Sequence, residues 1–322
     1  MKDIIQVRVS EEFESERLDV FITRFIDVIP SRSFASKLIE NKKIKVNEKF
    51  YKSSYRLKLN QLIEIDTAFL SEINQIPNAE NIPLDILYED SHLIVINKPS
   101  GMVVHPGAGV NSGTLVNAIL GYCGVTLPTL GNPSRAGIIH RLDRDTSGVM
   151  VVAKSQIALT HLSKQFADHS QIRIYNAIVF GEFIPKEGKI ETWHGRDPKN
   201  RLKYSVQEEG VGKKAILYYS TIENLSHNLC SLISCKLFTG RTHQIRVQMS
   251  YMQHGIIGDA LYTKIPQSVK NNKELAAIIG KNASRQMLHA THLGFKHPVS
   301  GENMSFDAPY PDDFKNILTL LK

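Results

Sequence analysis

The 322-residue sequence has few cysteines, no long apolar run and little net charge for its length. Its three cysteines, Cys123, Cys230 and Cys235, are too few for a disulfide framework and suit a reducing compartment. No stretch approaches the roughly 20 apolar residues of a membrane-spanning helix. The first eight residues lack the apolar segment of a signal peptide. These absences predict a cytoplasmic protein that does not enter a membrane.

The common motifs of cofactor and metal chemistry are also missing. The sequence has neither a P-loop nor Gly-x-Gly-x-x-Gly, which argues against nucleotide hydrolysis and against a dinucleotide cofactor. Its twelve histidines and three cysteines do not fall into Cys-x-x-Cys or His-Glu-x-x-His spacing, so no metal site is expected. A Gly-x-Ser-x-Gly nucleophile elbow is absent as well.

What the chain does have is an ordinary globular composition and a local excess of positive charge. Apolar residues make up 42% and charged residues 22%, with a net charge of +7. Residues 31–58 carry nine Lys or Arg and two Glu, whereas residues 67–97 carry five acidic residues and no Lys or Arg. This switch, together with the Asn and Pro content of residues 74–83, predicts a linker and a boundary near residue 75. We therefore expect two domains, residues 1–75 and 76–322.

The first domain is predicted to be a small module of two helices and a few strands. Apolar residues from Leu18 to Phe25 recur on one helical face, a second helix is expected after Ser31, and alternation predicts strands at 43–47 and 62–65. The second helix and first strand carry a dense set of basic residues. A solvated basic face would explain them, but their density favours a nucleic-acid-binding surface. These residues are Arg32, Lys37, Lys42, Lys43, Lys45 and Lys49.

The second domain has many strand signals and few helix signals. A helix opened by Ser155 is expected, with apolar residues four apart. Strict alternation of strands and helices is absent, which favours an α+β fold with a mixed, mostly antiparallel sheet over a doubly wound one. The predicted strands are rich in β-branched and aromatic residues and lie at 93–96, 149–152, 174–180, 215–219 and 229–237.

Two polar runs next to predicted strands are candidate sites. His140–Gly148 lies between two apolar segments, and it suits either a catalytic loop or a turn held by an Arg141–Asp145 ion pair. Thr239–Arg246 suits either an anion site, with two Arg and a His beside a glycine turn, or a solvated hairpin end.

Three further side chains have an ordinary structural explanation. Tyr175 lies in a predicted strand, where a core tyrosine with a hydrogen-bonded hydroxyl is expected by default. His289 and His297 follow no mechanistic spacing, so we interpret them as structural histidines.

These motifs together resemble the RluA-type pseudouridine synthases, most closely the branch that acts on large-subunit ribosomal RNA. The resemblance spans nearly the whole chain, and its strongest signature is Gly137–Gly148. Arg173 stands where the family often has Lys, which keeps the charge. Further motifs follow in family order: Asn97–Gly101, Val104–Gly107, Gly113–Asn117, Tyr175–Gly181, Thr239–Arg246, Gly258–Tyr262 and Leu288–Ala290.

The N-terminal module resembles the small α-L RNA-binding domain that is named after a ribosomal small-subunit protein. Three short segments carry this likeness: Arg17–Asp19, Ser31–Ser33 and Val46–Lys49. It agrees with the basic surface that the charge pattern predicts.

The resemblance implies isomerisation of a uridine within RNA. The base leaves the sugar, turns and rejoins through carbon 5, so no group is added and no cofactor is expected. Asp143 occupies the position of the catalytic carboxylate, which either attacks a carbon or removes a ribose proton. Both roles need it ionised, and because burial opposes ionisation a nearby cation is expected. Arg246 is the first choice for that cation and Arg241 the second.

The resemblance also implies roles around the uridine. Tyr175 would stack on the uracil, and Arg141 would fill the space that the flipped nucleotide leaves. His140 would contact a phosphate or hold the loop.

The expected partner is ribosomal RNA of the large subunit or its assembly precursor, with no obligate protein partner. Two alternatives stay open: the same enzyme acting on transfer RNA, and a non-catalytic RNA-binding or ribosome-assembly protein.

Overall fold

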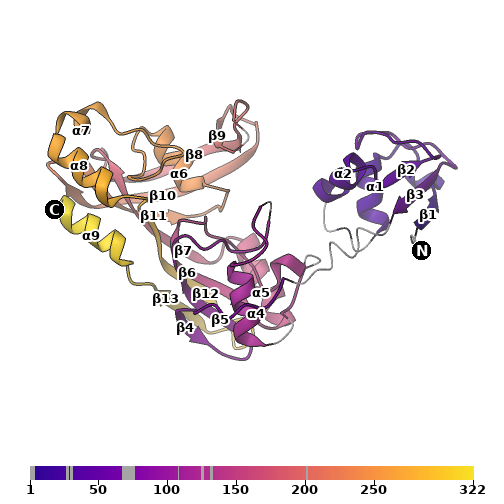
Figure 1. Ribbon diagram of the computed structural model, residues 1–322, viewed down its shortest axis with the longest axis horizontal. Coiled ribbons are helices and arrows are strands. Elements are labelled where there is room, and N and C mark those ends of the chain that lie inside the picture. The colour runs from indigo at the N-terminus through magenta and orange to yellow at the C-terminus, as the bar shows by residue number, and fades with distance from the viewer. Residues whose placement is uncertain are drawn as a thin grey trace. The chain divides into compact units, whose positions relative to one another are not determined.

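The computed structural model describes residues 4–26, 29, 32–66, 77–107, 109–124, 127–130, 133–200 and 202–322, without the side chains of residues 33, 37 and 133. The described chain divides into two compact units. One comprises Met1–Pro77 and Thr129–Ala136, and the other comprises Asn78–Pro128 and Gly137–Lys322 (Figure 1). The predicted helix cap Ser31 and the side chain of Lys37 fall outside the described part.

The N-terminal unit packs two helices on a small antiparallel sheet. Leu18, Phe21 and Ile22 on one helix face are fully buried, as the apolar periodicity predicts. The first strand was not predicted, because its residues are mostly exposed and carry little apolar alternation. The elements are β1 (Ile4–Arg8), η1 (Glu11–Phe13), α1 (Leu18–Phe25), α2 (Arg32–Glu40), β2 (Ile44–Val46) and β3 (Leu62–Asp66), in the sheet order β1-β3-β2.

The larger unit is built on one ten-stranded sheet. Its order is β4-β5-β6-β12-β7-β11-β10-β8-β9, with β13 beside β12. Among the described strands, only β6 and β12 pair in parallel, which confirms the α+β class with a mixed, mostly antiparallel sheet. The strands are β4 (Ile86–Glu89), β5 (Leu93–Lys98), β6 (Ser147–Ala153), β7 (Ile172–Phe180), β8 (Glu187–Arg196), β9 (Tyr204–Gln207), β10 (Lys213–Leu225), β11 (Cys230–Leu237), β12 (Leu288–Lys296) and β13 (Asn303–Asp307).

Helices pack on this sheet at several places along the chain. The predicted helix is α5, and Ser155 caps it by accepting a hydrogen bond from the Ala158 amide at 3.3 Å. Near the C-terminus, α8 and α9 bury Leu275, Ile279 and Phe314 in a cluster with residues of β7 and β11 (Figure 1). The helices of this unit are α4 (Leu115–Cys123), α5 (Gln156–Ala167), α6 (Gln244–Tyr251), α7 (Gln267–Asn271), α8 (Lys273–Asn282) and α9 (Asp312–Leu321), whereas the short η2 (Pro133–Arg135) belongs to the N-terminal unit. In the described chain, no helix has the length and apolarity that crossing a membrane requires.

The parallel pairing of β6 and β12 fixes the position of the His140–Gly148 run. Gly148 pairs with Ala290, and the two backbones approach so closely that a Cβ at Gly148 would lie 2.2 Å from the Ala290 carbonyl oxygen. Gly148 also has φ = 119°, which other residues rarely adopt. Glycine at this position therefore lets β6 start beside β12.

Part of the segment expected to be a linker packs on the larger unit instead. The Asn117 side chain on α4 donates to the Asn78 carbonyl at 2.7 Å, and the Glu80 amide donates to the Asn117 carbonyl at 3.0 Å. The Glu80 carboxylate also accepts from the Gly113 amide at 3.0 Å. The Asn and Pro content is thus explained by an irregular segment whose polar groups are satisfied by α4. Residues 67–76, where the boundary was expected, lie outside the described residues.

Candidate active site

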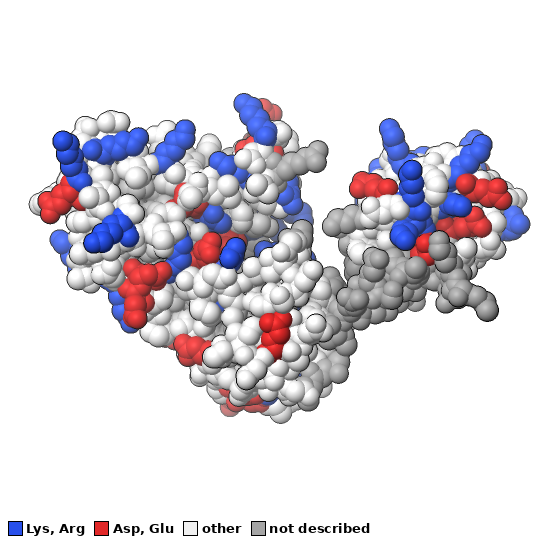
Figure 2. Space-filling view, viewed as in Figure 1, with Lys and Arg blue, Asp and Glu red and all other residues white. Residues whose placement is uncertain are grey.

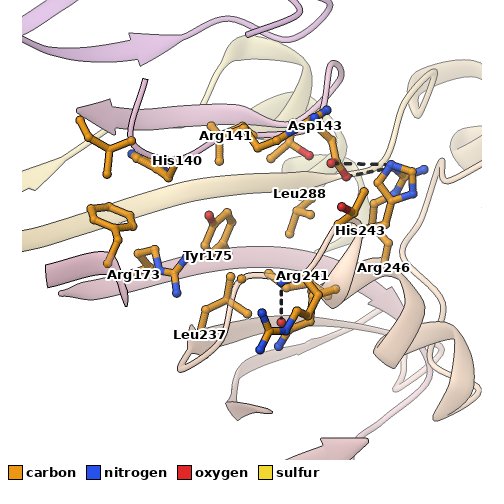
Figure 3. A pocket seen from close by; sticks show the side chains of 18 of the residues that line it. His140, Arg141, Asp143, Arg173, Tyr175, Leu237, Arg241, His243, Arg246 and Leu288 are labelled. Carbon is orange, nitrogen blue, oxygen red and sulfur yellow. Dashed lines mark hydrogen bonds and ion pairs between the residues drawn. The ribbon is translucent and has the colours of Figure 1, made fainter. Parts of the chain in front are cut away.

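The two polar runs meet in one pocket of about 620 Å³ in the larger unit, although about 100 residues separate them in sequence. Residues 140–146, here named the Asp143 loop, form one side of it. The start of α6 and the first half of β7 form others (Figure 3). Asp143, Tyr175 and Arg246 all line this pocket, with Tyr175 lying between the Asp143 end and the Arg173 end (Figure 3).

Asp143 forms an ion pair with a buried arginine. Nη1 of Arg246 lies 3.0 Å from Oδ2 of Asp143, and these side chains are 9% and 16% exposed. Arg246 also donates from Nε and Nη2 to the two carboxylate oxygens of Asp259, at 2.7 and 2.9 Å. A guanidinium fixed on one edge by a bidentate pair presents its remaining nitrogen in one direction. That direction is toward Asp143.

Arg246 stays positively charged in the pocket. Burial lowers the pKa of Arg246, but the hydrogen bonds and negative charge of Asp259, with those of Asp143, raise it above its ordinary value overall. Asp259 is itself held, because its Oδ1 accepts from the amides of Leu261 and Tyr262 at 3.0 and 3.2 Å. The motif Gly258–Tyr262 contained this carboxylate, but its partner could not be inferred from the sequence.

Arg246 lies in the first turn of α6, which corrects the hairpin-end alternative for Thr239–Arg246. Gln244 fastens the turn before it, since its Oε1 accepts from the Arg241 amide at 3.0 Å and its Nε2 donates to the Ile216 carbonyl at 3.1 Å. His243 precedes the helix with φ = 58°. The chain therefore changes direction at His243, immediately before α6, and the Arg246 side chain points into the pocket.

His243 lies on the other side of the Asp143 carboxylate. Its Nε2 is 3.7 Å from Oδ1 of Asp143, and its Nδ1 is 2.7 Å from the Tyr262 hydroxyl. Burial lowers the pKa of His243 below its ordinary value, against the pull of Asp143. The imidazole is therefore neutral at pH 7, and Arg246 supplies the positive charge beside Asp143.

Tyr175 points into the pocket from β7 and is 7% exposed. Burial raises the pKa of Tyr175, so its phenol stays protonated at neutral pH. Among the described residues none hydrogen-bonds its hydroxyl, which faces the pocket instead of a partner in the core. Its surface in the pocket is available to a planar ligand.

Arg141 and His140 differ sharply although they are neighbours. Arg141 is exposed at the pocket and has no ion pair in the described part, so the alternative Arg141–Asp145 pair does not form. Asp145 instead lies 4.0 Å from Arg144. The His140 ring stacks on Phe166 with centroids 4.6 Å apart, and its Nε2 accepts from the Val151 amide at 3.2 Å. Burial lowers the pKa of His140 to about 3, so the ring is neutral and favours the loop-holding alternative.

Three buried side chains for which the sequence suggested no role hold the Asp143 loop, two through its backbone and one through a side chain. Lys98 is fully buried and donates to the Arg144 carbonyl at 3.1 Å. Arg285, paired with Asp313 at 2.6 Å, donates to the Asp145 carbonyl at 3.0 Å. Gln286 donates to the Thr146 hydroxyl at 3.3 Å. Three consecutive positions of the loop, residues 144–146, are therefore held from two distant parts of the chain, Lys98 and the neighbouring pair Arg285 and Gln286.

The remaining predicted residues lie in other places. Arg241 lines the pocket, but its Nε donates to the Lys214 carbonyl at 3.0 Å and it makes no ion pair with Asp143. His289 accepts or donates at both ring nitrogens, to Ser147 at 2.8 Å and the Ala308 carbonyl at 3.1 Å, as a structural histidine should. His297 likewise lies 2.9 Å from Asp90.

The basic residues of the N-terminal unit are mostly exposed (Figure 2). Lys42 and Lys45 lie 5.9 and 5.7 Å from the ring centre of Phe50, an aromatic residue that is 46% exposed. Lys49 is also exposed. Two of the predicted cations are already paired: Arg32 lies 3.1 Å from Asp19, and Lys43 lies 3.5 Å from Asp66.

Comparisons with known protein families match the two units separately. The family model for RNA pseudouridylate synthase matches residues 92–251, which contain Asp143, Tyr175 and Arg246. The model of the S4 domain matches residues 16–63.

Similar curated proteins cover most of the chain. Ribosomal large subunit pseudouridine synthase D of Neisseria meningitidis is 42% identical over 99% of this chain and 82% of the relative. The protein of that name from Zymomonas mobilis is 45% identical over 75% of this chain and 74% of the relative. The solved structure of human RNA pseudouridylate synthase domain containing 1 shares the fold, with a TM-score of 0.55 and 22% identity over 72% of this chain and 86% of that chain.

Proposed function

The chain belongs to the RNA pseudouridylate synthase family, and from this premise we propose that it isomerises uridine in large-subunit ribosomal RNA with Asp143 as the catalytic carboxylate. The observation that carries the proposal is the Asp143–Arg246 ion pair inside a pocket that also holds Tyr175. Family membership makes the protein an isomerase.

The reaction is an isomerisation, so the protein has to position the nucleotide and supply charged groups beside it. The bond from C1′ to N1 breaks, the uracil turns, and a bond from C1′ to C5 forms; C5 loses a proton and N1 gains one. Asp143 serves as the carboxylate that attacks a carbon or removes a ribose proton, and the Arg246 guanidinium, 3.0 Å away, places a positive charge beside it. The hold of Lys98 and Arg285 on the loop backbone keeps the carboxylate in place while the base turns.

The target nucleotide must leave its stack to reach Asp143. Flipping a nucleotide out of its stack costs a few kcal/mol, and the cost is lowest in loops and single strands. Tyr175 offers its ring surface to the uracil, a contact worth roughly 1–3 kcal/mol. Arg141, exposed and unpaired among the described residues, is free to enter the space that the nucleotide leaves.

The two units would divide the work. The S4 domain supplies an exposed basic surface with Lys42, Lys45 and the aromatic ring of Phe50, which suits a folded RNA. The larger unit performs the chemistry. The three free cysteines suit the cytoplasm, where ribosomal RNA is found.

The alternatives are less well supported. Burying the three charges of Asp143, Arg246 and Asp259 costs folding free energy. Catalysis gives a reason for that cost, whereas RNA binding alone does not. Transfer RNA as substrate would not conflict with the pocket. The names of the relatives, however, favour the large ribosomal subunit.

Tritium release tests the proposal directly. RNA is transcribed with uridine labelled at C5, because that hydrogen leaves when C5 joins the sugar. Large-subunit RNA should release tritium with the wild-type protein, whereas small-subunit and transfer RNA should not. Release from transfer RNA alone would overturn the substrate, and release from none would overturn the activity.

A further inference from the structure

A second buried arginine lines the pocket without a carboxylate partner. Arg173 on β7 is 7% exposed and lies at the end of the pocket away from Asp143, beyond Tyr175 (Figure 3). Its Nη2 donates to the Phe238 carbonyl at 3.3 Å, and its Nε is buried without any hydrogen-bond partner in the described part of the chain. Its guanidinium also lies 5.5 Å from the ring centre of Phe166.

This arrangement contrasts with the other buried arginines of the pocket region. Arg246 and Arg285 each hold an aspartate with two nitrogens, whereas no acidic side chain among the described residues pairs with Arg173. Burial accordingly lowers the pKa of Arg173, and the only opposing influence comes from Tyr175. A buried charge without a counter-charge is unfavourable for folding. Its presence is explained if an anion from outside the chain completes the pair.

The space around Arg173 is suited to such an anion. Gly240 packs against it, and a Cβ there would lie 2.6 Å from Nη1, so a larger residue at position 240 would displace the guanidinium. Arg241 follows directly and makes no ion pair in the described chain. His169 lies close to both arginines, since their charges add to burial in lowering the pKa of His169. Two cations and an imidazole thus meet at one end of the pocket; Asp168 acts on His169, but among the described residues it forms no ion pair with either arginine.

We propose that Arg173, supported by Arg241, binds a backbone phosphate of the RNA next to the uridine that lies over Asp143. The inference rests on the proposed function, since it takes RNA as the pocket's substrate. A nucleotide that enters the pocket brings its phosphates with it, and a planar guanidinium matches a phosphate with two parallel hydrogen bonds. Phosphate contacts fix the register of a nucleic acid on a protein without reading its bases. Arg173 would therefore set how far the flipped nucleotide enters.

The test is a binding cycle that needs no turnover. A short stem-loop from large-subunit RNA is made with a neutral methylphosphonate at each linkage flanking the target uridine, one at a time. Affinities are measured in an Asp143→Asn background with Arg173, Arg173→Met or Arg173→Lys. With Arg173 present, one neutral linkage should weaken binding about tenfold, the size of one charged hydrogen-bonded contact. In Arg173→Met the same linkage should change the affinity less than twofold, and Arg173→Lys should fall between them.

Two controls separate the outcomes. Lys281→Gln removes an exposed cation of α8 outside the pocket, and it should keep the full sensitivity to the neutral linkage. Without RNA, Arg173→Met should unfold at the same or a higher temperature, because an unpaired buried charge has been removed. Equal losses in Arg173 and Arg173→Met proteins at every linkage, or a melting point lowered by several degrees in Arg173→Met, would overturn the phosphate site. Absence of pseudouridine despite the coupling would overturn only the proposed function.

Discussion

The two units use positive charge in opposite ways. In the N-terminal unit Lys42, Lys45 and Lys49 are exposed on flexible side chains. In the pocket, Arg246 is 9% exposed and is held by two aspartates at fixed distances. Exposed cations interact through solvent and are screened by salt, whereas a buried pair keeps its geometry and is screened much less. The first arrangement is suited to attracting a polyanion and the second to orienting a reacting group.

This contrast predicts that substitutions in the two units change different measurements. Loss of a pocket charge should lower the rate of the chemical step, and loss of a surface charge should lower affinity and its dependence on salt.

Asp143→Asn should lower the single-turnover rate of pseudouridine formation by about 10³-fold or more, because the amide can neither attack nor accept a proton. The dissociation constant for RNA should change by no more than a few fold. Asp145→Asn is the matched control, since this carboxylate lies in the same loop but does not contact Arg246. Near-normal turnover by Asp143→Asn would end the catalytic assignment.

Asp259→Asn should lower the same rate by about 10²-fold without touching the substrate, because Arg246 loses the bidentate partner that aims it at Asp143. Removing one member of a buried ion pair should also lower the free energy of unfolding by about 3 kcal/mol. The rate is therefore measured well below the melting temperature. Asp312→Asn on the exposed start of α9 provides the control. A rate equal to that of the control would show that Asp259 does not position Arg246.

Replacing Lys42, Lys45 and Lys49 together with Gln should weaken binding to a large RNA about tenfold. The slope of log affinity against log salt should fall by about 2, since each phosphate contact contributes about 0.7 to 0.9. The effect should lie in affinity rather than in the rate at saturating RNA. The Lys43 ammonium lies 3.5 Å from Asp66, so Lys43→Gln should change the salt slope less than a single Gln substitution at position 42, 45 or 49. An unchanged slope in the triple variant would show that this face does not meet RNA.

Acid should destabilise the larger unit through its buried histidines, whereas residues 1–91 contain no histidine. Burial lowers the pKa of His289 to about 4, below the 6.5 of an ordinary histidine, so the unfolded chain takes up the proton first. The stability is present in full above pH 6.5 and falls as pH drops toward 4, by up to about 1.4 kcal/mol per pH unit. The free energy of unfolding is measured with denaturant at several pH values. Between pH 6.5 and 4 it should depend less steeply on pH in His289→Gln than in the exposed-site control His161→Gln. An equal pH dependence in the two variants would contradict the prediction.

The sequence was informative where local patterns and family motifs coincide. It predicted the family, the α+β class, and helices α1 and α5, because apolar periodicity and a serine cap are local signals. It did not predict α6. Its residues Gln244–Met249 are all buried, with polar and apolar side chains alternating along the helix. A helix that is buried on every side has no amphipathic stripe to detect.

The supports of the site were beyond sequence reasoning for a related reason. Lys98 meets the loop backbone 46 residues away, and Arg285 meets it 140 residues away. Asp259 was visible in a motif, but its place behind Arg246 depends on how α6 is oriented. The same holds for Arg173, whose lack of an acidic partner among the described residues is a property of the folded pocket.

Pseudouridine mapping in cells tests the central claim, that Asp143 in this pocket modifies large-subunit ribosomal RNA. A strain lacking the protein is complemented with wild type or with Asp143→Asn, and pseudouridines are mapped chemically in ribosomal and transfer RNA. We expect pseudouridine to be lost at one or a few neighbouring large-subunit positions and restored by wild type but not by Asp143→Asn. Loss confined to transfer RNA, or restoration by Asp143→Asn, would contradict the account.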